Sequence, residues 1–380
     1  MTPFPLIEIS GTPLERGHAY GRQAATRIRA SIAHYKEQVR KLSLSDAGIA
    51  AVVRKYLPMA ESYGQHYVQE MRGIAEGADV AFDDVFLLNA RTEIMKIAQR
   101  PDLQKKLAAD VPDGCTSVTV LPAATRDGQL IHAQNWDWKE ECVDTGVVLR
   151  VLRDDGPDFL TFTEAGMLAR SGLNAAGIAI TGNNLECNRD YSQIGVPLPF
   201  IRRRALESAH LAIAMHAVYA TPKSGSNNMA VSHRDGIVLN FECAPDETFT
   251  IEADERGLLV HSNHWLSPVA LGKLKDTGVA LSPCTLYRHT RVRELLLPHV
   301  GRITADDVKH ALLDDYQSPW SVCRPPRQDF GRPTRSATVA TIVMQPALGV
   351  IEVAALPAVQ PAFTRYTLAA GSQVVDRKAA

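Results

Sequence analysis

A glycine–cysteine pair at Gly114-Cys115 is the feature of this sequence with the clearest chemical potential. Gly114 has no side chain, so a nucleophile can approach its carbonyl carbon closely. The Cys115 thiol can attack that carbonyl, and an N→S acyl shift then converts the peptide bond into a thioester that water hydrolyses. Cleavage at this site would leave Cys115 at the N-terminus of a new chain.

The new α-amino group would give the thiol a base of its own. An unperturbed α-amino group has a pKa of roughly 7.7–8.0, close to the neutral pH at which a general base is most effective. One residue would then supply both the nucleophile and the base that activates it. Taken alone, the pair is weak evidence, because a single cysteine is more often a small buried apolar residue.

Four short motifs follow one another along the chain and give the pair its weight. They are Asp113-Gly114-Cys115-Thr116, Gln134-Asn135-Trp136-Asp137, His261-Ser262-Asn263-His264 and Ser321-Val322-Cys323-Arg324. Their order resembles the fungal acyl-coenzyme A:6-aminopenicillanic acid acyltransferase family, whose members are self-processing N-terminal-nucleophile (Ntn) hydrolases. The likeness covers most of the chain and includes residues 11–17, 88–94, 163–166 and 173–177.

The resemblance implies roles for particular residues. Cys115 matches the nucleophile and the first residue of the β fragment, with the cleavage site at Gly114 and Cys115. Asp137 matches the carboxylate that holds the α-amino group, since a carboxylate orients a nearby cationic amine. Asn263 matches the oxyanion-hole amide, an interaction typically worth roughly 3 kcal/mol. Arg324 matches the arginine beside the nucleophile, where a guanidinium favours the thiolate.

Two further residues are predicted to contribute to binding. Thr116 follows the nucleophile directly, and Asn135 belongs to the Asn-Trp-Asp motif. The sequence departs from the family at Trp138, where phenylalanine often stands, and no feature specific to β-lactams is apparent. What the resemblance implies is therefore acyl transfer through a thioester, to water or to an amine, rather than one particular substrate.

Several of these residues have simpler interpretations. Asp137 can be a turn or cap residue, Asn263 a hydrogen-bonding loop residue, and Arg324 a surface charge. His261 and His264 have the His-x-x-His spacing of a metal site, but no further ligand set accompanies them. No metal and no other cofactor is predicted.

The pattern of elements changes at the candidate nucleophile. Up to about residue 110 the chain reads as helices, with a capping box at 12–15, an apolar stripe over 20–32, a helix start at 45–46 and a helix end near Gly77. Residues 100–106 are predicted to form a surface connection. Strands are predicted at 116–121, 129–136, 147–152, 159–163, 177–181, 229–232, 237–242, 338–344 and 350–354, and helices at 199–219 and 304–313.

Helices followed by antiparallel hairpins indicate an α+β fold. The resemblance implies the four-layer αββα sandwich of Ntn hydrolases. Residues 1–114 would form a mainly helical segment, the α chain, and residues 115–380 would carry the two sheets as the β chain. The two fragments are expected to remain one folding unit, because the apolar stripes of the first segment need a partner surface.

Composition narrows the possible partners. The chain has 41 basic and 42 acidic residues and a formal net charge of −1, which predicts no nucleic-acid or membrane-binding surface. No run of 18 apolar residues is present, so no transmembrane helix is expected. The six cysteines form no Cys-x-x-Cys pair, and neither terminus resembles a targeting signal. A cytoplasmic protein with free thiols is expected.

The leading hypothesis is a self-cleaving cysteine acyltransferase or amidohydrolase that acts on C–N bonds of small N-acyl compounds, with acyl-coenzyme A as one candidate donor. An alternative is a hydrolase of β-alanyl or other aminoacyl amides on the same fold. A third, of another class, is a non-catalytic binding protein on an Ntn fold. The sequence leaves the acyl group, the acceptor and the oligomeric state open.

Overall fold

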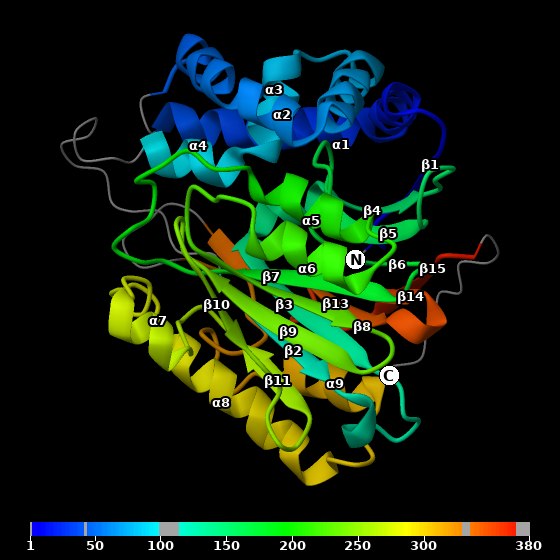
Figure 1. Ribbon diagram of the computed structural model, residues 1–380, viewed down its shortest axis with the longest axis vertical. Helices are drawn as coiled ribbons and strands as arrows, with labels where there is room; N and C mark the ends of the chain where they lie inside the picture. Colours follow the sequence, from blue (N-terminus) through cyan, green and yellow to red (C-terminus); the bar gives the residue numbers. More distant parts are fainter. Residues whose placement is uncertain (1, 42–43, 99–113, 329–334, 370–380) are drawn as a thin grey trace.

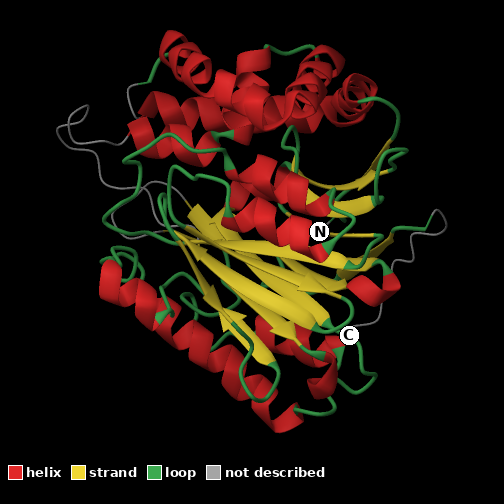
Figure 2. Cartoon of the chain, in the orientation of Figure 1, coloured by secondary structure: helices red, strands yellow, loops and turns green. Residues whose placement is uncertain are grey.

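The structure, a computed structural model, describes residues 2–41, 44–98, 114–328 and 335–369. Asp113 and the predicted connection over 100–106 lie outside the described residues. Two β-sheets stack face to face, and helices cover the outer face of each sheet (Figure 1). The same order of helix, sheet, sheet and helix is visible when the chain is coloured by secondary structure (Figure 2). This arrangement confirms the predicted α+β fold with four αββα layers.

The N-terminal segment supplies most of the first helical layer. Its helices are α1 (Pro13–Lys41), α2 (Asp46–Ala78), α3 (Phe82–Asn89) and α4 (Arg91–Ala98). The predicted capping box starts α1, because Thr12 N donates to Glu15 Oε2 at 2.8 Å and Glu15 N donates to Thr12 Oγ1 at 3.4 Å. Ser45 caps α2 by accepting from Gly48 N at 3.2 Å.

Glycines let α1 and α2 approach each other closely. A Cβ added to Gly73 would lie 2.2 Å from the Leu14 carbonyl oxygen, and one added to Gly77 would lie 2.3 Å from that of His18. The helix end predicted near Gly77 is confirmed, because α2 ends at Ala78. The residue that takes the left-handed conformation there is Asp79, at φ 54°, and Gly77 serves helix packing instead.

The first sheet lies beneath these helices. In the described ranges its strand order is β1 (Leu6–Ile9), β4 (Gly146–Val151), β5 (Phe159–Glu164), β6 (Ser171–Asn174), β7 (Ile178–Asn184), β8 (Asn227–His233), β9 (Ile237–Cys243) and β10 (Thr248–Ile251). β1 pairs parallel with β4, whereas the other neighbours are antiparallel. The N-terminal segment thus also contributes a strand, which the sequence pattern did not predict.

The second sheet carries the candidate nucleophile. In the described ranges its order is β11 (Leu258–His261), β2 (Gly114–Val120), β3 (Ile131–Lys139), β13 (Arg335–Gln345), β14 (Val350–Ala355) and β15 (Phe363–Thr367), and β12 (Arg327–Gln328) pairs with β13. Alternate side chains of β2 face opposite sides. Cys115 belongs to the core between the sheets, and Val118 and Val120 belong to the core under the outer helices.

The outer helices α8 (Cys284–Leu296) and α9 (Ala305–Leu312) cover the second sheet. The short helix α7 (Pro268–Lys273) packs instead in a small cluster that includes Ala270 and Phe249 of β10. Thr304 and Asp307 form a capping box at the start of α9, which confirms the helix predicted there. Figure 1 shows α8 and α9 on the side of the sheets opposite α1–α4.

The helix predicted over 199–219 is two helices, α5 (Leu198–Leu206) and α6 (Leu211–Tyr219). The Asn174 amide causes the break. Its Nδ2 donates to the carbonyls of Leu206 and Ser208 at 2.9 and 2.8 Å. These two carbonyls therefore accept hydrogen bonds from a side chain of β6 rather than from the backbone of a continuing helix. Apolar periodicity alone does not reveal this tertiary contact.

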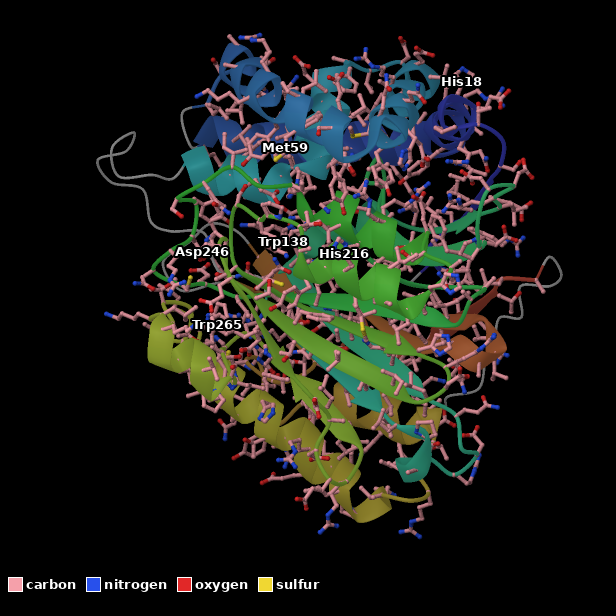
Figure 3. All side chains as sticks on the ribbon, in the orientation of Figure 1. His18, Met59, Trp138, His216, Asp246 and Trp265 are labelled. Atoms are coloured by element: carbon pink, nitrogen blue, oxygen red, sulfur yellow. The ribbon has the colours of Figure 1, made fainter. Side chains whose placement is uncertain are left out.

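A buried network joins the first helical layer to both sheets. Arg91 Nη2 of α4 lies 2.7 Å from Glu164 Oε2 of β5, and Tyr35 of α1 donates to the other carboxylate oxygen. Trp138 of β3, labelled in Figure 3, donates its Nε1 proton to Tyr35 Oη at 2.9 Å. Residues on both sides of the 114/115 boundary take part, so the network would hold the two fragments together after cleavage.

Membrane insertion through a helix finds no support in the described part of the chain. None of its helices combines the length and the apolar character needed to cross a bilayer.

Candidate active site

The candidate site lies where β2 begins and β3 ends. Antiparallel pairing places Gly114 opposite Asp137 and Cys115 opposite Trp136. On the other side of β2, β11 ends at His261, opposite Ser117. The chain continues directly from β11 into the segment that carries Asn263. Segments far apart in the sequence therefore meet at the Gly114–Cys115 peptide.

Asn263 presents its amide oxygen to Cys115, the candidate nucleophile. Cys115 N donates to Asn263 Oδ1 at 2.8 Å, and Arg288 Nη2 donates to the same oxygen at 2.8 Å. Asn263 Nδ2 donates to the Asn184 carbonyl at 3.0 Å. Two donors on one side fix the orientation of an amide. The Asn263 side chain thus accepts a hydrogen bond from the Cys115 nitrogen. An oxyanion hole requires a hydrogen-bond donor instead, so the oxyanion-hole role of Asn263 stays a prediction.

We expect Asn263→Ala to slow both self-cleavage and turnover by roughly a hundredfold. Loss of Oδ1 leaves the Cys115 nitrogen and the buried Arg288 guanidinium without this acceptor, at a cost of roughly 3 kcal/mol. The rate of fragment formation and kcat would be measured side by side. Asn174→Ala, which removes another buried amide at the end of β6, is the matched control and should leave cleavage unaffected. Wild-type rates in Asn263→Ala would contradict the role.

Asp137 and Arg324 form a buried ion pair beside Gly114. Arg324 Nε lies 3.3 Å from Asp137 Oδ2, and both side chains are at most 2% exposed. Thr338 Oγ1 donates to Asp137 Oδ1 at 2.6 Å and accepts from Arg324 N at 2.8 Å. A Cβ added to Gly114 would lie 2.2 Å from Arg324 Nη1 and 2.8 Å from Asp137 Oδ2. The pair is therefore packed directly against the residue before Cys115.

Thr116 and Asn135 lie on the outer face of the second sheet, away from the thiol. Thr116 Oγ1 accepts from Arg288 Nη1 at 2.7 Å. Asn135 Nδ2 donates to the carbonyls of Leu312 and Val322 at 2.6 and 3.0 Å. Asn135 thereby ties the end of α9 and the segment leading to Arg324 onto β3. The structure does not bring these two predicted binding residues to the sulfur atom.

Sequence reasoning missed two arginines that the structure brings to Cys115. Arg288 Nη1 donates to the Cys115 carbonyl at 2.7 Å. Arg170 Nη2 lies 4.0 Å from the Cys115 Sγ atom. A signal for Arg288 exists in the sequence, because it occupies the buried stripe of α8 with Val292 and Leu296 at four-residue spacing. Arg170 has no such periodic signal.

Cys284, at the start of α8, is a second thiol close to this cluster. Arg324 Nη2 donates to its Sγ at 3.1 Å, and Ser282 Oγ lies 3.3 Å away. Burial raises the pKa of the Cys284 thiol, but the charges of Arg324 and Arg288 and the hydrogen bond from Ser282 outweigh burial, so the pKa is lowered overall. Its thiolate therefore persists at lower pH than that of an ordinary cysteine.

We expect Cys284 to react with iodoacetamide far faster than Cys187 at pH 7–8. The two residues are similarly exposed, 8% and 5%, but burial raises the pKa of Cys187 to about 11. Since only the thiolate reacts and each pH unit is a factor of ten in its population, the ratio should be about a hundredfold or more. Peptide mapping after timed alkylation measures both sites. Equal labelling rates would contradict the lowered pKa of Cys284.

The histidines near Asn263 have protein partners. His261 Nε2 lies 2.7 Å from Glu242 Oε1, and His264 Nδ1 lies 2.9 Å from Thr285 Oγ1. Burial lowers the pKa of His264 to about 3, so it is neutral near pH 7. In the described ranges, no group of three or more His, Cys, Asp or Glu side chains is placed to hold a metal ion.

Comparison with known proteins finds curated relatives of this chain. The chain is 26% identical over 324 residues to the acyl-coenzyme A:6-aminopenicillanic-acid-acyltransferase 40 kDa form of Emericella nidulans, which is 84% of each chain. No protein-family model matches.

Solved structures of an amidase, a hydrolase and an acylase are also similar. A Caenorhabditis elegans N-acylethanolamine-hydrolyzing acid amidase ortholog matches with a TM-score of 0.42 and 17% identity, over 62% of this chain and 94% of that one. A mutant of conjugated bile acid hydrolase from Clostridium perfringens gives 0.45 and 13%, over 63% and 89%. Penicillin V acylase from Agrobacterium tumefaciens gives 0.42 and 13%, over 63% and 83%.

Proposed function

We propose that this chain, which is 26% identical over 84% of its length to an acyl-coenzyme A:6-aminopenicillanic-acid-acyltransferase, is a member of that family and an Ntn cysteine acyltransferase or amidohydrolase that cuts itself between Gly114 and Cys115. Its substrates would be small N-acyl compounds, and Cys115 would carry the acyl group as a thioester. Acyl-coenzyme A is the donor that the name of the Emericella nidulans relative suggests. Residues 1–114 and 115–380 would remain together as α and β chains.

One observation carries the proposal. The nitrogen of Cys115, which would become the α-amino base, donates to Asn263 Oδ1 at 2.8 Å. On the other side of the same peptide, the Asp137–Arg324 ion pair packs against Gly114. A cysteine that only packs in a core does not need three buried polar side chains, here Asn263, Asp137 and Arg324, around its backbone.

The proposed cleavage uses only the chain and one water molecule. Cys115 Sγ attacks the Gly114 carbonyl carbon, the C–N bond breaks, and the thiol proton passes to the departing nitrogen. Water then attacks the thioester and leaves a carboxylate on Gly114, while Cys115 regains its thiol and keeps a free α-amino group. The Asn263 oxygen, which accepts from the peptide nitrogen before cleavage, can accept from the amine afterwards.

Turnover would repeat the same chemistry on a substrate. The α-amino group of Cys115 takes the thiol proton, and the thiolate attacks the carbonyl carbon of the acyl donor. When the donor is an amide, its C–N bond breaks and the leaving nitrogen takes the proton held by the α-amino group. Water or an amine then resolves the thioester, and the choice between them separates a hydrolase from a transferase.

Trapping the thioester tests this function. Processed protein would be mixed with a panel of N-acyl amides and acyl-coenzyme A compounds, quenched in acid and weighed by mass spectrometry. We expect an added acyl mass on the fragment that begins at Cys115, removed by hydroxylamine. Proteolysis of the quenched protein, with the acyl mass mapped to the peptide that contains Cys115, separates this label from one on Cys284. Turnover of a panel member without any acyl mass on that fragment would overturn the thioester mechanism.

A further inference from the structure

We propose that Arg170 is a further catalytic residue, whose guanidinium stabilises the Cys115 thiolate from the side of the first sheet. The inference deepens the proposed function and rests on it. Arg170 Nη2 lies 4.0 Å from Cys115 Sγ. A guanidinium this close to a sulfur atom favours the thiolate, which is the form that attacks a carbonyl.

The backbone of Arg170 is held firmly in this place. Arg170 directly precedes β6, and its backbone N–H donates to Thr161 Oγ1 of β5 at 3.2 Å. The next residue, Ser171, donates its hydroxyl proton to Gln134 Oε1 of β3 at 2.6 Å. Hydrogen bonds therefore tie this stretch to both sheets, so that the side chain reaches across the interior from the first sheet to the second.

Trp136 holds the guanidinium beside the sulfur atom. Arg170 Cζ lies 4.3 Å from the centre of the Trp136 ring, within the range of a cation–π contact. Trp136 is directly opposite Cys115 in the pairing of β2 and β3. The tryptophan of the Asn-Trp-Asp motif, which packing alone would explain, thus also aims a cation at the nucleophile.

Arg170 and Arg324 occupy different sides of the reacting residue. Arg324 lies against Gly114 and is paired with Asp137 and Cys284. Arg170 approaches the side chain of Cys115 from the first sheet. During turnover the thiol proton goes to the α-amino group, and Arg170 keeps all its protons, because a guanidinium does not deprotonate in proteins. Its contribution is a fixed positive charge next to the forming thiolate.

The test is the pH–rate profile of Cys115 alkylation by iodoacetamide in processed Arg170→Gln protein, followed on the Cys115 peptide by mass spectrometry. We expect the midpoint to move upward by about one to three pH units, as for loss of an opposite charge at this distance. One unit corresponds to about tenfold less thiolate near neutral pH, so kcat should fall at least about tenfold, with a smaller change in KM.

Two variants make the result decisive. Arg170→Lys retains the charge but lacks the planar group that stacks on Trp136, so the midpoint of its alkylation profile should move upward by about half as much as in Arg170→Gln. This variant keeps the shift measurable if Arg170→Gln does not fold. Arg16→Gln, which removes an arginine that is also 3% exposed but lies in α1, should leave the profile unchanged. An unshifted profile in either folded Arg170 variant overturns the proposal.

This experiment separates the role of Arg170 from the function itself. Alkylation needs no substrate, so the profile reports on the thiol alone. An unshifted profile together with a dead Cys115→Ala protein would remove only the role of Arg170. An active Cys115→Ala protein would remove the proposed function.

Discussion

Cys115→Ala is expected to remain a single chain of 380 residues and to show no turnover, whereas the unaltered protein is expected to separate into two fragments under denaturing conditions. In the proposed mechanism the sulfur atom is both the group that attacks the Gly114 carbonyl and the group that carries the acyl chain. Its removal therefore abolishes processing and catalysis together. Intact-mass spectrometry would find fragments 1–114 and 115–380 in the unaltered protein and one species in the variant.

Loss of another buried cysteine should have neither effect. Cys243 is also fully buried, and its Sγ lies 3.7 Å from the Phe241 carbonyl in β9. Cys243→Ala should still be cut and active, at some cost in stability. Two results would end the proposal: fragments in Cys115→Ala, which would require an outside protease, or full activity in the uncut variant.

The residues that gather around the Gly114–Cys115 peptide could be predicted from the sequence, because they lie in short motifs whose order along the chain is informative. The structure brings Cys115, Asp137, Asn263 and Arg324 to one place. The strand pattern also predicted which segments pair, since β2 and β3 alternate their side chains across a buried sheet. Local patterns of this kind depend only on residues that are close together in the sequence.

The orientation of side chains could not be predicted in the same way. Which end of the Asn263 amide faces Cys115 depends on Arg288, a residue 25 positions later on another element. The approach of Arg170 to the sulfur depends on how the two sheets stack. The helix break at Asn174 and the glycine packing of α1 on α2 are likewise long-range contacts. Such contacts decide the chemistry of the site, and no periodicity in one segment encodes them.

Gly114→Ala tests whether the residue before the nucleophile has to be glycine. Its added Cβ would lie 2.2 Å from Arg324 Nη1 and 2.8 Å from Asp137 Oδ2. The end of an arginine side chain can usually move, but this one is 2% exposed and paired with Asp137. Disrupting a buried ion pair costs roughly 3–5 kcal/mol. If most of that cost falls on the cleavage step, the rate drops by roughly a hundred- to several-thousand-fold.

A time course of fragment formation after synthesis would measure the rate, and thermal unfolding would show how much of the cost falls on the folded precursor. Gly272→Ala is the matched control, because a Cβ there would meet no atom within 4 Å, and it should be processed at the wild-type rate. Unlike Cys115→Ala, Gly114→Ala keeps the thiol, so cleavage should be slow rather than absent. That difference separates the two requirements of the site: a sulfur atom that reacts, and room for an ion pair against the bond that is cut. Processing of Gly114→Ala at the wild-type rate would show that the ion pair is not needed there.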